Sequence, residues 1–96
     1  MNKHLVFKFL LYVAGGTQNS ASAVANLTTL CHTHLSERRY DIEVIDVFRE
    51  PKRALADGIL MTPMLIKLSP SPIRRIIGTL SDTQSLLTAL EFPIVK

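Results

Sequence analysis

The fold of this chain follows first from the stretch LVFKFLLYV, residues 5–13. Every residue in it except Lys8 is apolar or aromatic, and the run does not alternate. A continuous apolar run of this length is typical of a strand buried on both faces, in the middle of an α/β sheet. The turn AGGT, residues 14–17, ends the strand, and Gln18–Ser20 supplies capping residues for a helix.

A helix and a second strand follow this turn. Val24, Leu27, Cys31 and Leu35 recur at spacings of three and four, which predicts one apolar stripe on a helix that ends near residues 36–39. Residues 40–48, YDIEVIDVF, begin with a period-two alternation and predict the second strand. Strand, helix and strand at this spacing form a βαβ unit, with parallel strands and a right-handed crossover.

The second half of the chain is less regular. Pro51 suits the first position of a short helix, and Gly58 is a suitable residue to end it. The dipeptide Thr62-Pro63 is unfavourable within a helix, and Met64–Leu68 is a short apolar segment that follows it. Residues 73–77 predict a strand that ends at the next glycine.

A last helix is predicted at about residues 82–91, because Ser81 and Gln84 have the spacing of a capping box. Pro93 prevents its continuation. The resulting order, β-α-β-α-β-β-α, is that of the thioredoxin fold, so we predict a mixed α/β (α+β) domain.

Composition restricts the class of protein. Ninety-six residues make one domain, and a net charge of +3, with its basic residues spread along the chain, does not predict nucleic-acid binding. A single cysteine gives no disulfide framework. No signal peptide is visible, and the nine-residue apolar run falls far short of the roughly 20 residues of a membrane helix. We therefore expect a cytoplasmic protein that does not bind membranes.

Enzymatic chemistry has little support in the sequence. A thioredoxin-like redox enzyme needs a reactive thiol in the turn after the first strand, and residues 15–20, GGTQNS, contain none. Cys31 lies on the apolar stripe and is interpreted as a buried hydrophobic residue. The glycine turn lacks the lysine and spacing of a phosphate-binding loop. His4, His32 and His34 form no metal-binding pattern. We expect no cofactor and no metal; the alternative is an enzyme whose groups meet only in three dimensions.

Three proline positions allow two interpretations. Thr62-Pro63 falls where thioredoxin-like domains place a cis-proline, and Pro70 and Pro72 flank Ser71 in the next turn. The three X–Pro bonds could gate a slow rearrangement, since their isomers differ by only about 0.5–1 kcal/mol. The alternative is a rigid hairpin turn, which physical reasoning alone favours.

Four segments together resemble the KaiB family of circadian clock proteins. The first is LYVAG, residues 11–15, followed by Thr17 and Asn19-Ser20. The others are VIDV at residues 44–47 with Pro51, the segment around Thr62-Pro63, and residues 70–82 with their two prolines and RRIIG. They follow one another in order over about residues 5–91.

The resemblance implies a single domain, residues 1–96, that binds the ATPase KaiC and modulates its phosphorylation and ATPase cycle. It also implies metamorphic behaviour: the βαβ half, about residues 4–48, persists, while the second half, about 50–94, adopts either a ground-state fold, as a dimer or homotetramer, or a thioredoxin-like fold. The alternative function is a thioredoxin-like adaptor for a histidine kinase or a stress-response partner. We expect the ground-state fold in a structure, because concentration favours the oligomer.

Several positions depart from the family pattern. Glu43 replaces the lysine near the KaiA contact, which argues against KaiA binding and indicates a divergent paralogue. Ala89 replaces a glycine, and Ala is favoured over Gly within a helix by about 0.8–1 kcal/mol, so it favours the thioredoxin-like state. The partner-binding residues assigned from the sequence are Lys67, Arg74, Arg75 and Glu43. The fold-switch residues assigned from it are Pro63, Pro70, Pro72, Gly78, Ala89 and Glu91.

Overall fold

The computed structural model describes residues 6–35 and 39–92, which contain the predicted elements in the predicted order. They are β1 (Phe7–Val13), α1 (Gln18–His34), β2 (Tyr40–Asp46), α2 (Pro51–Ala56), β3 (Met64–Ser69), β4 (Arg74–Ile77) and α3 (Thr83–Ala89). The strands form one sheet in the order β2-β1-β3-β4. β1 is parallel to β2 and antiparallel to β3, which in turn is antiparallel to β4. The predicted βαβ unit and the central place of β1 are therefore confirmed.

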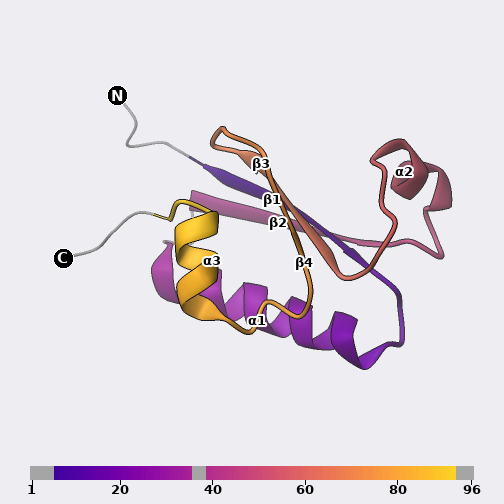
Figure 1. Ribbon diagram of the computed structural model, residues 1–96, viewed down its shortest axis with the longest axis horizontal. Coiled ribbons are helices and arrows are strands. Elements are labelled where there is room, and N and C mark those ends of the chain that lie inside the picture. The colour runs from indigo at the N-terminus through magenta and orange to yellow at the C-terminus, as the bar shows by residue number, and fades with distance from the viewer. Residues whose placement is uncertain (1–5, 36–38, 93–96) are drawn as a thin grey trace.

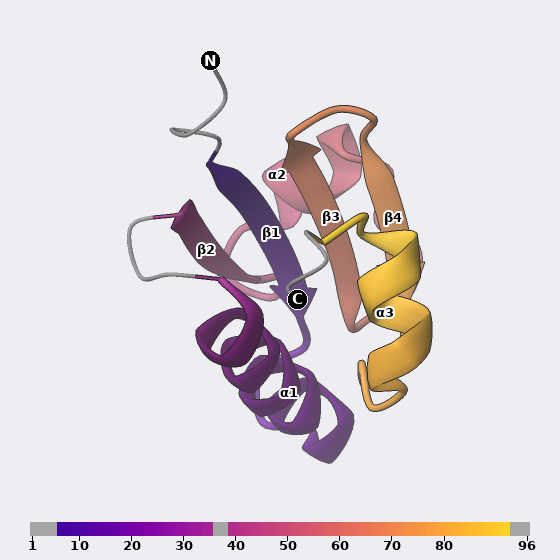
Figure 2. The ribbon, with the colours of Figure 1, turned by 90° about the vertical axis from the view of Figure 1, so that its left-hand side faces the viewer.

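The helices cover the two faces of the sheet unequally. α1 and α3 pack on one face, and α2 lies on the other, at the opposite end of the sheet from α3 (Figure 1, Figure 2). The larger core lies under α1 and α3, where alternate residues of β1 meet the apolar stripe of α1. Its buried members are Phe7, Phe9, Leu11, Val13, Ala23, Leu27, Leu30, Cys31, Leu35, Leu65, Leu80, Leu86, Leu90 and Phe92.

The start of α1 is set by side chains in the turn that precedes it. Thr17 is the N-cap, and its hydroxyl accepts a hydrogen bond from the backbone N–H of Ser20 at 3.4 Å. Ser20 is buried, and its hydroxyl oxygen accepts one from the N–H of Ala14 at 2.9 Å. These bonds satisfy backbone donors at the end of β1 and in the first turn of α1, which would otherwise lack partners.

The second half corrects two expectations. The expected ground-state fold is wrong for this structure, in which β3, β4 and α3 complete a thioredoxin-like arrangement. Ala89 is the last residue of α3, in agreement with its helix preference. The cap of α3 is Asp82 instead of Ser81: the Asp82 carboxylate accepts hydrogen bonds from the N–H and the hydroxyl of Ser85, at 3.2 and 2.8 Å. The two carboxylate oxygens of Asp82 accept one hydrogen bond each, whereas Ser81 has a single hydroxyl oxygen and lies one residue earlier in the chain.

A smaller core lies under α2. Its buried residues are Tyr12, Ile45, Ala54, Met64 and Ile66. α2 itself is six residues long and buries only Ala54. So little apolar burial cannot by itself fix the position of a helix, and polar contacts from the strands must contribute.

Candidate protein-interaction surface

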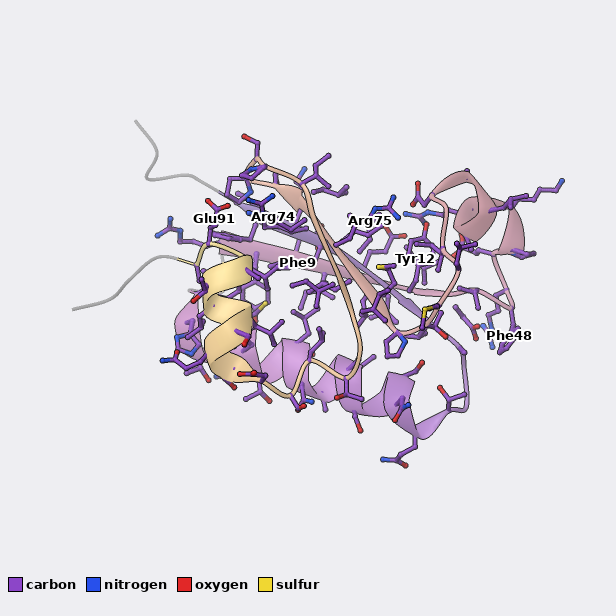
Figure 3. All side chains as sticks on the ribbon, viewed as in Figure 1. Phe9, Tyr12, Phe48, Arg74, Arg75 and Glu91 are labelled. Atoms are coloured by element: carbon purple, nitrogen blue, oxygen red, sulfur yellow. The ribbon has the colours of Figure 1, made fainter. Side chains whose placement is uncertain are left out.

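The segment around α2 exposes large apolar side chains to solvent. Phe48 is 71% exposed, Leu55 81%, Leu60 92% and Met61 59%. Figure 3 shows Phe48 at the end of the molecule remote from α3, pointing away from the sheet. We define the α2 surface as these four residues together with Arg49 and Lys52, which are also exposed.

A bidentate ion pair joins α2 to β2. The guanidinium of Arg53 donates to both carboxylate oxygens of Glu43, at 2.7 and 2.8 Å, and Glu50 lies 3.6 Å from the same guanidinium. The hydrogen bond from Arg53 lowers the pKa of Glu43 below its usual value. Paired Arg nitrogens match the geometry of a carboxylate, so this contact specifies the orientation of α2 on the edge strand.

Two further contacts hold the end of α2 through Asp57. The hydroxyl of Tyr12, on β1, donates to the Asp57 carboxylate at 2.5 Å, and Arg75, on β4, donates to the Asp57 carbonyl at 2.7 Å. Burial, and then the bond to Asp57, raise the pKa of Tyr12 to about 12. With Glu43, three different strands thus contribute a polar contact to one short helix.

The turn before α2 is tied to the turn after β1 by Asp46. Its carboxylate accepts from the N–H of Phe48 at 2.9 Å and from the N–H of Gly15 at 3.3 Å. A Cβ at Gly15 would overlap the Asp46 carboxylate. Glycine is therefore required at position 15 for this close approach, and Asp46 fixes the backbone that carries Phe48.

Lys67 lies inside the larger core. Its side chain is completely buried, donates to the carbonyl of Leu90 at 3.1 Å, and places the ammonium 5.9 Å from the centre of the Phe7 ring. Burial lowers the pKa of Lys67, and the nearby Glu91 carboxylate opposes this shift. In this arrangement Lys67 links β3 to the end of α3 and offers no exposed atoms to a partner.

Arg74 and Arg75 point to opposite faces of the sheet. Arg74 pairs with Glu91 at 3.2 Å, next to Lys67, whereas Arg75 reaches Asp57 beneath α2 (Figure 3). Glu43 lies on the same face as Arg75. The assigned partner-binding residues therefore do not form one site, and each has an intrachain contact; a direct contact with a partner stays a prediction.

The assigned fold-switch residues lie at the junctions of the second half. The peptide bonds before Pro63, Pro70 and Pro72 are cis, and the latter two prolines form the turn between β3 and β4. Gly78, with φ +121°, ends β4, and its N–H donates to the Pro63 carbonyl at 3.0 Å. Glu91 follows α3 with φ +57°. A role of these positions in fold switching stays a prediction.

Among the described residues, the thiol and imidazole groups form no recognisable reactive site. Cys31 is buried, and burial raises the pKa of its thiol to about 12. In the described part of the chain, no three His, Cys, Asp or Glu side chains are grouped to hold a metal ion. His32 and His34 lie on α1, and His4 lies outside the described residues. Within residues 6–35 and 39–92, no helix combines the length and apolar character needed to cross a membrane.

The comparison with known proteins identifies the family. The model of the KaiB domain matches residues 10–92. The chain belongs to the KaiB family. It is 41% identical to the circadian clock protein KaiB3 of Synechocystis sp. over 81 residues, which cover 84% of this chain and 78% of that protein. It is 42% identical to the circadian clock oscillator protein KaiB of Prochlorococcus marinus over 91 residues, 95% of this chain and 84% of that protein.

Solved structures confirm the thioredoxin-like fold of this KaiB-family chain. The N-terminal domain of SasA from Synechococcus elongatus superposes with a TM-score of 0.72 at 18% identity, covering 96% of this chain and 90% of that one. Chloroplastic thioredoxin z superposes with a TM-score of 0.75 at 16% identity, covering 90% and 77%. At such low identity these likenesses show the arrangement of the elements and nothing about shared chemistry.

Proposed function

We propose that this protein is a clock or clock-like regulator that binds a KaiC-type ATPase and modulates its phosphorylation and ATPase cycle. Family membership supports the partner class. The structural observation that carries the proposal is the exposure of four large apolar side chains on the short segment 48–61. Large apolar side chains exposed along one short segment are a feature of protein contact sites, although Val44, Leu68, Ile73 and Ile77 are also exposed elsewhere on the described residues. The protein then acts by binding, without chemistry of its own.

The decisive test is size-exclusion chromatography of the protein, alone and with the KaiC homologue encoded in the same genome. We expect the two proteins to co-elute and the phosphorylation cycle of the ATPase to change on addition. Separate elution at tens of micromolar would overturn the proposal. Co-elution with a histidine kinase instead would support an adaptor role. The same column, with light scattering, measures whether the free protein is a monomer, dimer or tetramer.

KaiA is not expected to join the complex. The family lysine near the KaiA contact corresponds to Glu43 in this chain, and Glu43 is paired with Arg53. A partner that needs a cation at this position meets a carboxylate that is already engaged. KaiA added to the preformed complex should therefore elute separately, and its co-elution would contradict this part of the proposal.

Arg74 and Arg75 are the assigned contact residues that expose their side chains on β4. If they meet acidic groups of the ATPase, the double variant Arg74→Glu/Arg75→Glu loses co-elution. Because Arg74 also pairs with Glu91, the variant Glu91→Gln is the matched control for loss of that internal pair. Unaltered binding of the double variant would remove both arginines from the contact.

A further inference from the structure

The last part of the described chain is attached to the fold at few points. Residues 79–92, which we call the C-terminal segment, comprise the end of the β4–α3 connection, α3 and the residues after it. Within α3 only Leu86 is buried, and the other buried residues of the segment are Leu80, Leu90 and Phe92. Figure 2 shows α3 over the side of the sheet formed by β3 and β4, beside α1. These side chains anchor the segment in the larger core.

The connection between β4 and α3 has a strained backbone. Gly78 and Leu80 both have positive φ, +121° and +63°. Glycine adopts such a conformation readily, whereas the Cβ of a leucine makes it unfavourable. Leu80 is buried in the larger core, so the packing of its side chain holds the backbone in this conformation. If the connection ran away from its own sheet, Leu80 could return to an ordinary conformation.

Closing the C-terminal segment also buries an ammonium group. Lys67 is completely buried, and its Nζ donates to the carbonyl oxygen of Leu90, the C-cap residue of α3. Removing a charged group from water is unfavourable, and this hydrogen bond offsets only part of that cost. Release of the segment returns the ammonium to water. The segment is therefore easier to detach from the sheet than its apolar contacts alone would indicate.

We propose that two copies of this protein exchange their C-terminal segments, so that each α3 packs on the sheet of the other copy. The β4–α3 connection is the hinge. In the exchanged dimer the contacts of the segment recur between copies, including those of Lys67 with Leu90 and of Arg74 with Glu91. Only the hinge changes, and short connections under strain favour this kind of exchange. Each half keeps the thioredoxin-like arrangement, so this dimer is distinct from an oligomer of the ground-state fold.

A dimer of two closed copies has less support. β4 is an edge strand, and its first two residues, Arg74 and Arg75, are both exposed. Cations on an edge strand oppose its pairing with the same strand of a second copy. Exchange needs no such pairing, because it reuses contacts that the closed fold already makes.

The first experiment strains the hinge. Gly78 and Gly58 both have positive φ, and a Cβ at either position meets no atom within 4 Å, so alanine there strains the backbone alone. In Gly78→Ala the strain lies in the closed hinge, which exchange relaxes in both copies. In Gly58→Ala, the matched control, the strain lies after α2 and is the same in monomer and dimer.

Size-exclusion chromatography with light scattering, on protein incubated at millimolar concentration, measures the dissociation constant of the dimer. We expect Gly78→Ala to lower this constant by about thirtyfold, because two hinges are relieved. Gly58→Ala should leave it unchanged. A Gly78→Ala protein that stays monomeric, or equal constants for the two variants, would overturn the proposal.

The second experiment detects the exchange itself. Arg74→Glu and Glu91→Arg each place two like charges where the ion pair lies. When the two variants are mixed, exchange combines the sheet of one with the C-terminal segment of the other, and opposite charges meet in both halves of the mixed dimer. With one variant isotope-labelled, native mass spectrometry counts the dimers. We expect the mixed dimer to exceed its statistical share by roughly threefold to tenfold.

Two closed copies in contact would keep the like charges within each chain, so they would give the statistical proportions. Statistical proportions, or no mixed dimer, would therefore overturn the proposal. So would a dimer that lacks the NMR signals of the thioredoxin-like arrangement. None of these measurements uses the ATPase, so the proposed function can fail or hold independently.

Discussion

The burial of Cys31 predicts a specific loss of stability at alkaline pH. The thiol lies in the larger core, and burial raises its pKa from 9.0 to about 12. The folded state thus keeps the proton over a range in which the unfolded state releases it. A group whose pKa is raised on folding contributes its full stability below the unfolded pKa, and this contribution is lost as pH rises toward the folded pKa. The stability contributed by the buried Cys31 thiol is therefore lost between about pH 9 and about pH 12.

The size of the effect follows from the two pKa values. Above the pKa of the thiol in the unfolded state, each unit of pH lowers the free energy of unfolding by about 1.4 kcal/mol, as long as the folded thiol stays protonated. With values of 9.0 and about 12, the free energy of unfolding should fall by about 2 kcal/mol between pH 8 and pH 10.5 because of this one group. That is a large fraction of the roughly 5–15 kcal/mol typical of a small domain.

Urea unfolding followed by circular dichroism, under reducing conditions, measures this loss in the native protein and in Cys31→Ala. The variant loses about 1 kcal/mol of packing at every pH. Between pH 8 and pH 10.5, however, the free energy of unfolding of the variant should fall by about 2 kcal/mol less than that of the native protein, because the variant has no thiol to ionise. Tyr12 and Lys67 also have shifted pKa values, but they are common to both proteins. Parallel pH profiles for the two proteins would refute the reasoning, because they would show that folding does not raise the pKa of the thiol.

Three further predictions concern the turn after β1, the second half and the attachment of α2. Gly15→Ala should lower the free energy of unfolding by about 1–2 kcal/mol in urea, because the new Cβ overlaps the Asp46 carboxylate. If the stability losses of Gly15→Ala and Asp46→Ala add fully in the double variant, the two side chains do not interact and the overlap is contradicted. Ala89→Gly should reduce the population of the thioredoxin-like arrangement by up to about fivefold, measured from NMR signal intensities, since helix preference differs by about 0.8–1 kcal/mol. Identical spectra would count against a role of Ala89 in this balance. Glu43→Lys should accelerate amide hydrogen exchange in α2, and Arg53→Glu in the same chain should restore protection. Unchanged exchange in the single variant would show that the ion pair does not hold the helix.

The order of elements could be predicted from local patterns because those patterns are contiguous. The run at residues 5–13 placed β1 in the centre of the sheet, and the stripe through Leu27 and Cys31 identified the buried face of α1. The thioredoxin-like order could also be predicted, although the ground-state arrangement was expected and was wrong. No local pattern distinguishes two packings of one segment that differ by only a few kcal/mol.

The contacts around α2 were not predictable in the same way. Glu43 was noticed as a departure from its family, but its bond to Arg53 joins residues on different elements. The partners Tyr12 and Asp57 are 45 positions apart. The burial of Lys67 was missed because charged side chains are seldom buried, even within an apolar strand. Neighbouring residues of a strand face opposite sides of the sheet, so only this alternation could have shown that Lys67 lies on the other face from Ile66 and Leu68. The exposure of Phe48 was not predicted, because the sequence pattern placed residues 40–48 in the second strand, whereas β2 ends at Asp46.

The attachment of α2 has an evolutionary consequence. The helix gives the core only Ala54, and its position depends on side chains that belong to three strands. The outward residues from Phe48 to Met61 are therefore under little selection for folding, and mutations there can accumulate at small cost to the fold. A duplicated gene could change its binding preference at these positions while the scaffold is inherited intact. Divergence of paralogues in this family should accordingly be fastest on the α2 surface and slowest at Tyr12, Gly15 and Asp46.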